Sequence, residues 1–195
     1  MVATHDTRQP GYLPVLESDN TADPIDALRV YVSQITGLDL PLVRRRWIQK
    51  PGTQPGLETD WASVAIDEIR TWATPGSVKI KGLIPNPESG KEKRVSHQTM
   101  TVSVWFYGPN AQVKADDFRE GAYLGQNNDM LKRQGLTMQG VEDRVRHLPD
   151  FAFEQWIDKY EVRLLIGRAV VRTFGVRTIA GLTSIDIKTD IIPNK

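Results

Sequence analysis

The sequence predicts an α+β fold in which a mainly antiparallel sheet of four to five strands carries helices packed on one face. Apolar and polar residues alternate in residues 99–106 and again after residue 159, as expected for strands with one covered face. Apolar residues recur at helical spacing after residues 24 and 109. Clusters of glycine and proline separate these segments and mark turns and loops.

The composition is typical of one globular domain and excludes several function classes. Hydrophobic residues make up 39% and charged residues 25% of the 195 residues, and the net charge is +1. Such a charge does not recruit DNA or an anionic membrane through bulk electrostatics. There is no cysteine, which excludes disulfides and thiolate metal sites and indicates a reducing compartment or a particle assembled in one. The polar N-terminus is not a secretory signal, and no apolar run approaches a membrane span of about 20 residues.

The first segments are predicted to be an arm and a helix. Residues 1–23 lack periodicity and are interpreted as an N-terminal arm that is ordered only against a partner. Asp23 and Pro24 are a helix start signal, and Gly37 is expected to end the helix in a left-handed conformation. The apolar stripe of this helix is predicted to be core: Ile25, Leu28, Val32 and Ile35.

The next strand is predicted from Leu42 to Gln49 and carries a basic cluster, which an acidic cluster follows. The basic residues are Arg44, Arg45, Arg46 and Lys50; the acidic ones are Glu58, Asp60, Asp67 and Glu68. Two patches of opposite charge on one protomer are compatible with head-to-tail contacts between copies, and solvated faces are the alternative.

Residues 60–72 fit either a helix or a strand, and their density of Trp, Val and Ile favours the strand. Residues 73–93 hold several prolines and glycines and a charged end. They predict an extended loop, with a short hairpin near Val78 to Leu83, at the rim of an assembly.

Residues 95–127 are predicted to organise the fold. A strand with Met100 to Phe106 alternating across its two faces runs into Gly108-Pro109, which forces a turn. A helix is expected to start at Pro109 and to fold back over the apolar face of the strand. Its predicted core residues are Ala111, Ala115, Phe118 and Ala122.

The C-terminal half predicts further strands. A short helix is expected at 127–134, ended by Gly135; a strand at 136–146; a turn at 148–150; and the longest strand from about 153 to 174. In that longest strand, Gly167 is interpreted as a bulge and Trp156 as a core residue. Residues 179–195 are expected to form a last strand or a C-terminal arm.

The sequence contains no catalytic or cofactor-binding signature. His5, His97 and His147 are isolated, and no nucleophile elbow, phosphate-binding loop or dinucleotide fingerprint occurs. Several arginines in the last two predicted strands raise the possibility of a nucleic-acid-binding domain: Arg144, Arg146, Arg163, Arg168, Arg172 and Arg177. Acidic residues between them favour a mixed-charge surface or subunit contacts instead.

Taken together, residues 24–178 resemble the phage neck or tail terminator family of head-to-tail connection proteins. Phe106-Tyr107-Gly108-Pro109 is the most recognisable motif. The other matching landmarks, in chain order, are Thr36-Gly37-Leu38, Val43-Arg44 through Trp47, Asp60-Trp61-Ala62, Arg119-Glu120-Gly121, Gln126-Asn127, Trp156 and Arg168 to Arg172. The sequence departs from the family pattern in the 73–93 loop and beyond Arg177.

The resemblance implies a non-enzymatic virion protein without cofactors or metals. It would form a homo-oligomeric ring, typically a hexamer, that ends the tail tube, meets the head connector or adaptor, and lets genomic DNA pass. The sheath protein is a further candidate partner. It would assemble in the host cytoplasm and contact no membrane. Another neck ring, such as a connector or tail-completion protein, is the alternative. Candidate interface residues are Arg44, Arg45, Arg46, Lys79, Lys81, Ile185 and Ile187.

Overall fold

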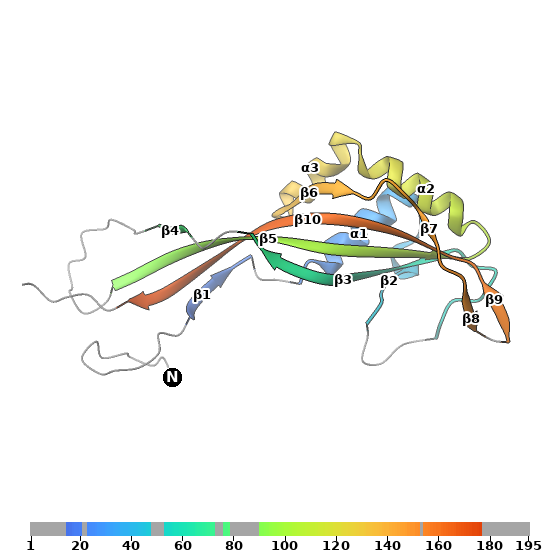
Figure 1. The fold of residues 1–195 in the computed structure, drawn as a ribbon, viewed down its shortest axis with the longest axis horizontal. Helices are drawn as coiled ribbons and strands as arrows, with labels where there is room; N and C mark the ends of the chain where they lie inside the picture. The colour runs from blue at the N-terminus through green and yellow to red at the C-terminus, as the bar shows by residue number, and fades with distance from the viewer. Residues whose placement is uncertain are drawn as a thin grey trace, which may run out of the picture.

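The structure, a computed structural model, describes residues 15–20, 23–47, 53–72, 76–78, 90–152 and 154–176. Two strands of 18 residues form its centre, β5 (Gly90–Tyr107) and β10 (Lys159–Val176). They pair antiparallel along their whole lengths, from Gly90 opposite Val176 to Tyr107 opposite Lys159. At about 3.3 Å per residue this ribbon is about 60 Å long, and Figure 1 shows it running through the whole molecule.

The remaining strands are added to the two edges of this ribbon. The path of the sheet is β1-β10-β5-β3-β2, and every pair in it is antiparallel except β2–β3. The other strands of this path are β1 (Val15–Asp19), β2 (Val43–Arg45) and β3 (Trp61–Thr71). Three short strands pair off the path: β4 (Gly76–Val78) with β5, and β6 (Leu136–Val141) and β7 (Arg146–His147) with β10. A separate hairpin is formed by β8 (Asp150–Ala152) and β9 (Gln155–Ile157).

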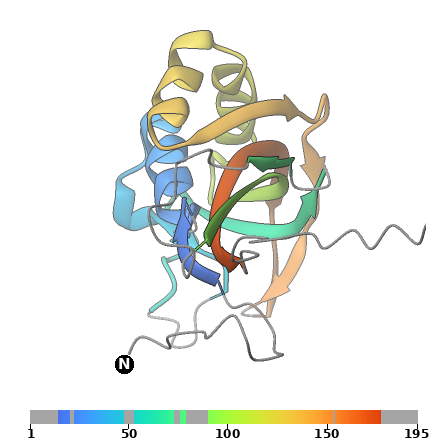
Figure 2. The ribbon, with the colours of Figure 1, turned by 90° about the vertical axis from the view of Figure 1, so that its left-hand side faces the viewer.

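Three α-helices cover one face of the sheet among the described residues. They are α1 (Ile25–Thr36), α2 (Ala111–Ala122) and α3 (Gly125–Arg133), and a single 3-10 turn, η1 (Leu40–Leu42), follows α1. Figure 2, which looks along the ribbon, shows the sheet curled and the helices gathered on one side of it. The α+β prediction, with a mainly antiparallel sheet and helices on one face, is therefore confirmed.

The core lies between the helices and the sheet because the strand registers align apolar residues in rows. Val162, Val104 and Val64 are direct neighbours across three strands, and all three are buried. Phe106 and Phe118 are fully buried in the same cluster, with ring centroids 5.6 Å apart. Both were predicted to be core from their spacing.

The ends of the helices follow the predicted signals closely. The backbone N–H of Ile25 donates to Asp23 Oδ1 over 3.0 Å, and Gly37 ends α1 with a positive φ of 70°. Helix α2 begins at Ala111, two residues after the predicted start at Pro109. Helix α3 begins two residues before the predicted Asn127 and is followed by Gly135, also at positive φ.

The turn between β5 and α2 depends on a glycine. Gly108 has a φ of 106°, and a Cβ there would lie 2.6 Å from both Asp60 Oδ1 and the carbonyl oxygen of Thr59. The Asp60 carboxylate accepts hydrogen bonds from the backbone and side chain of Asn110 at 2.8 and 2.9 Å. The start of β3 thus holds the end of β5 at the point where the chain turns back.

The N-terminal half differs from the prediction at three places. Residues 15–19, part of the predicted arm, form β1 against β10 of their own chain, because an open edge of that long strand lies beside them. The predicted strand 42–49 is shorter in the structure, where β2 consists of the three residues Val43 to Arg45 paired with β3. Strand β5 begins at Gly90, inside the predicted 73–93 loop, and β4 pairs with it. The short hairpin predicted near Val78 to Leu83 lies almost entirely outside the described residues. The ambiguous residues 60–72 form strand β3, as favoured.

The C-terminal half also differs. The predicted strand 136–146 is divided into β6 and β7. The predicted strand 153–174 is divided into β9 and β10, and β8 begins at the last residue of the predicted turn 148–150. Gly167 is not a bulge, since its pairing with Thr99 is continuous. The bulge lies instead on the neighbouring strand β6, where Gln139 is the extra residue in the pairing with β10. The Gln139 side chain occupies the space that a Cβ of Gly167 would fill, and its Oε1 accepts a hydrogen bond from Thr99 Oγ1 at 2.7 Å. Gly167 therefore provides room for a close approach.

We expect Phe118→Ala to destabilise the fold by about 3–5 kcal/mol, because it removes a fully buried aromatic ring and leaves a cavity between α2 and the sheet. Val113 lies on the same helix with 57% of its surface exposed. Val113→Ala is the matched control and should change the free energy of unfolding by no more than about 0.5 kcal/mol. Urea denaturation of both variants measures the difference, and equal effects would contradict this account of the core.

Candidate interaction surfaces

The face of the sheet opposite the helices carries a row of polar and charged residues. The registers place one residue of each strand in line across the sheet. In order from β2 to β7, the row consists of Arg44, Ser63, Trp105, Glu161 and Arg146. These residues are up to 102 positions apart in the sequence (146 − 44), and the sheet brings them together.

Trp105 is the centre of this face. The guanidinium of Arg46 lies 3.2 Å from the centroid of its ring, and Lys159 Nζ lies 4.2 Å from it. The indole N–H donates to Glu161 Oε1 at 3.0 Å, and Arg46 Nη1 donates to Ser103 Oγ at 2.9 Å. Cations over an indole ring are attracted by its negative face, so the aromatic ring and both cations stabilise one another.

The charges of the cluster are balanced within the chain. The Glu161 side chain is 2% exposed, and Arg163 Nε and Arg146 Nη1 lie 3.2 and 3.6 Å from its oxygens. A buried carboxylate without such partners would cost several kcal/mol. Burial lowers the pKa of Arg46, while Asp67 at 3.6 Å acts in the opposite direction. These ion pairs hold the side chains around Trp105 in fixed positions. The cluster does not place a nucleophile beside a general base, as a catalytic site would.

The three predicted interface arginines are separated by this geometry. Arg45 faces the helices and binds Asp23 Oδ2 at 2.6 Å and Asp26 Oδ2 at 2.7 Å, which ties β2 to the start of α1. Arg46 lies on the opposite face, over Trp105. Arg44 donates to the carbonyl oxygen of Thr53 at 2.6 Å. The structure therefore does not assemble them into one basic patch, and their role in an interface stays a prediction.

The arginines considered for nucleic-acid binding are largely engaged with their own chain. Arg146 pairs with Glu142 at 2.9 Å, Arg163 pairs with Glu161, and Arg168 donates to Gln98 at 2.9 Å. Phosphate binding requires cations that converge and are free to neutralise charge. The described part of β10 and its neighbours gives this alternative little support.

The other predicted site residues lie outside the described residues: Lys79, Lys81, Ile185 and Ile187. The predicted C-terminal arm, residues 179–195, lies there as well, as do most residues of the predicted loop.

The prediction that Trp156 belongs to the core is wrong. Trp156 is 73% exposed on β9, where it contacts Phe151 of β8 edge to face with centroids 5.4 Å apart. Phe151 is itself 60% exposed. The hairpin begins where the chain leaves the main sheet, so neither ring reaches the helices. The strand-like pattern of residues 153–158 continues into β10, so the sequence suggested one long strand with Trp156 in the core. The Pro149-Asp150 turn signal was the indication that the chain leaves the main sheet there.

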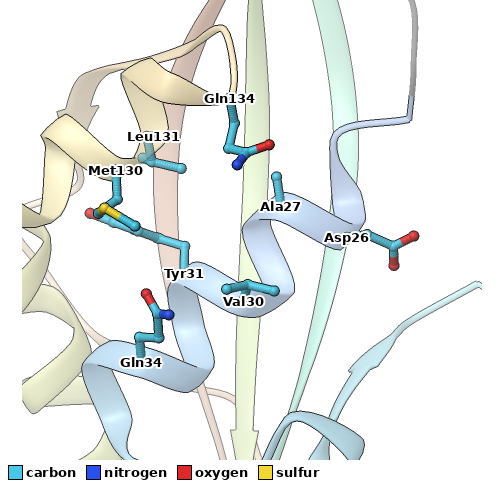
Figure 3. Close-up of a pocket in the computed structure, with 8 residues that line it drawn as sticks. All are labelled: Asp26, Ala27, Val30, Tyr31, Gln34, Met130, Leu131 and Gln134. Carbon is cyan, nitrogen blue, oxygen red and sulfur yellow. The ribbon is translucent and has the colours of Figure 1, made fainter.

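A groove between α1 and α3 is a second surface that the sequence did not reveal. Its volume is about 290 Å³, and its apolar lining is made of Ala27, Val30, Tyr31, Met130 and Leu131. Figure 3 shows the side chains of the two helices facing each other across it, with Gln34 and Gln134 at its margins. Val30 and Met130 are 40% and 47% exposed, so the groove is an open apolar surface.

Within the described residues, no group of histidine and acidic side chains could hold a metal ion. No described helix is long and apolar enough to cross a membrane.

Comparison with protein families decides the identity of the chain. Residues 24–194 match the model of a family described as phage neck terminator protein. The chain belongs to the phage neck terminator protein family. A search of curated proteins found no match.

Family membership confirms the resemblance seen in the sequence and its coarser consequences. A phage neck terminator protein is a structural protein and not an enzyme. Its location is the virion, in the neck, which implies contacts with tail and head components. The polar row, the exposed hairpin and the groove are the candidate surfaces for such contacts.

The Arg45–Asp26 pair predicts a specific pH dependence. Hydrogen bonding by Arg45, followed by Arg29, lowers the pKa of the Asp26 carboxyl below its usual 3.8. A lowered pKa contributes stability above the unfolded value, and this contribution is lost as the pH falls through the folded value. We expect Asp26→Asn to remove at most about 1 kcal/mol at neutral pH, since the carboxylate is exposed, and to remove less below about pH 4.

Urea denaturation of both proteins at several pH values tests this expectation. Asp117→Asn, an exposed change on α2, is the control and should leave the pH profile unchanged. A difference between Asp26→Asn and the unmodified protein that stays constant from about pH 7 to pH 3 would contradict the assignment.

Proposed function

We propose that six copies of this chain close into a ring that ends the phage tail tube and joins it to the connector of the head, with DNA passing through the ring. Membership of the phage neck terminator protein family supports this proposal. The observation that carries the proposal is the ribbon of β5 and β10, which extends beyond the helix layer (Figure 1).

The ribbon is too long for the core that its own chain provides. A helix of 12 residues spans about 18 Å, whereas the ribbon spans about 60 Å. Beyond the helices, the described chain adds only the short strands β1 and β4 to it. Every residue of β1 is exposed, including Val15 at 45% and Leu16 at 43%. A sheet of few strands without a covering layer is marginally stable, so contacts with neighbouring copies would complete it.

Open strand edges support the same conclusion. In the described residues, β2 pairs only with Ala62 to Val64 of β3, and the rest of that edge, up to Thr71, is left to solvent. A closed ring covers such edges cyclically, because each copy uses one surface on one neighbour and a different surface on the other.

The candidate contacts with neighbours and with the tube, connector or sheath remain those that the sequence suggested. They are Arg44, Arg45, Arg46, Lys79, Lys81, Ile185 and Ile187, together with the 73–93 segment and the two terminal segments. Long polar segments can order on a neighbour and increase the buried area without a larger core.

Passage of DNA is compatible with the charges. The net charge is +1, and the buried Glu161 neutralises cations around it. A channel built from such a protein would hold DNA weakly, which suits ejection, because tight phosphate contacts would oppose sliding.

Depletion of the protein from infected cells tests the proposal against the alternative of another neck ring. Loss of a terminator should give tails of uncontrolled length, which electron microscopy measures directly. Normal tails that are not attached to heads would instead identify a connector or a tail-completion protein.

The ring itself is tested on the purified protein, alone and with tail tubes added. We expect a mass of six subunits, or rings at the ends of tubes. A protein that stays monomeric and never caps a tube would contradict the proposal.

A further inference from the structure

We infer that the β8–β9 hairpin of one copy docks into the groove between α1 and α3 of the next copy, with Trp156 as its anchor. This inference rests on the proposed ring and names the contact that closes it. Its two halves are surfaces of different shape on the same chain, as a head-to-tail contact requires.

The hairpin presents an aromatic pair that its own chain leaves in solvent. Phe151 and Trp156 are direct cross-strand partners, and they are 60% and 73% exposed. The hairpin has three residues in each strand, so its backbone pairing alone is marginal in water. Aromatic residues exposed together are enriched where proteins bind one another, since they bury a large area at a low entropic cost.

The groove has the size and the lining that such an anchor needs. Its volume of about 290 Å³ accommodates one large aromatic side chain. Leu131 and Tyr31 are buried and form its floor, while Met130 is exposed, and a methionine adapts its shape to an inserted ring. The side-chain amides of Gln34 and Gln134 at the margin can accept the indole N–H of Trp156 (Figure 3).

Charge does not oppose the contact. Residues 150–158 contain three acidic residues and no lysine or arginine. Asp150 and Asp158 bind Lys159 and His147 of their own chain. The groove is lined by one charged residue, Asp26, whose carboxylate is paired with Arg29 and Arg45 of its own chain. The carboxylates of Asp26, Asp150 and Asp158 therefore have partners within the chain before the hairpin is seated.

The contact must form between two copies, because one chain cannot make it alone. Figures 1 and 2 both show the hairpin and the helix layer on opposite sides of the sheet. The exposed parts of the Trp156 and Phe151 side chains amount to about 200–300 Å². This is about a third of the 800 Å² per partner of a stable interface, so the docked hairpin is one part of a larger contact between copies.

The absence of cysteine permits a direct test. Gln155→Cys and Gln134→Cys place one thiol beside Trp156 and one at the groove, and they keep both the anchor and the apolar lining. The two variants are purified separately, mixed, assembled and treated with a short bismaleimide. We expect covalent dimers that contain one chain of each variant. The matched control pairs Gln155→Cys with Gln112→Cys, an exposed glutamine of α2 outside the groove, and should give no such dimer.

Removal of the anchor provides the second measurement. Trp156→Ala in the Gln155→Cys chain should abolish the cross-link and raise the subunit concentration needed for assembly at least tenfold, as expected for an interface hot spot. Trp72→Ala is the control, because Trp72 is exposed to a similar extent, 75%, at the end of β3. It should change neither result.

The outcomes separate this inference from the proposed function. Rings that form normally, alone or at the ends of tail tubes, but give no cross-link would overturn the inference and leave the ring intact. A protein that forms no ring under any condition would overturn the proposed function and the inference with it.

Discussion

The structure depends on one interaction, the antiparallel pairing of β5 and β10 over 18 residues each. Every other strand of the main sheet is attached to this ribbon directly, except β2, which is attached through β3. The pairing fixes which side chains share a face. It sets Val104 beside Val162 under the helices and Trp105 beside Glu161 on the opposite face. A shift of one residue would exchange these two faces and would bury the charges in the apolar core.

The two faces of the ribbon are stabilised in different ways. The helix face buries a continuous apolar cluster that includes Phe106 and Phe118, so area removed from water stabilises it. The opposite face holds Arg46, Trp105 and Glu161 together through hydrogen bonds, cation–π contact and ion pairs. Such a network stabilises the fold only when every charge has a partner. It gives the second face a fixed shape without a second apolar core, which suits a protein whose exposed surfaces contact other chains.

Short-range patterns in the sequence were sufficient for the helices and for the central strands. Asp23 and Gly37 mark the ends of α1 through capping preferences that act within one turn. The pairing of strands that lie far apart in the sequence could not be predicted from such short-range patterns. The edge strand β1, the bulge at Gln139 and the exposure of Trp156 all depend on what lies beside them in space. The alternation of Arg44 to Arg46 along one strand is a local pattern, and it sends Arg45 to the helix face and Arg46 to the opposite face.

The sequence by itself determined the α+β class, the apolar stripes of the helices, the turn at Gly108 and membership of the phage neck terminator family. These features depend on local periodicity, on backbone sterics and on the order of motifs along the chain. All three can be read directly from the sequence. Only the tertiary structure decided which exposed surfaces the chain presents. The polar row around Trp105, the groove between α1 and α3 and the projecting β8–β9 hairpin each combine separate elements. Strand register and helix placement create them, because burial is a property of neighbours in space and not of neighbours in sequence.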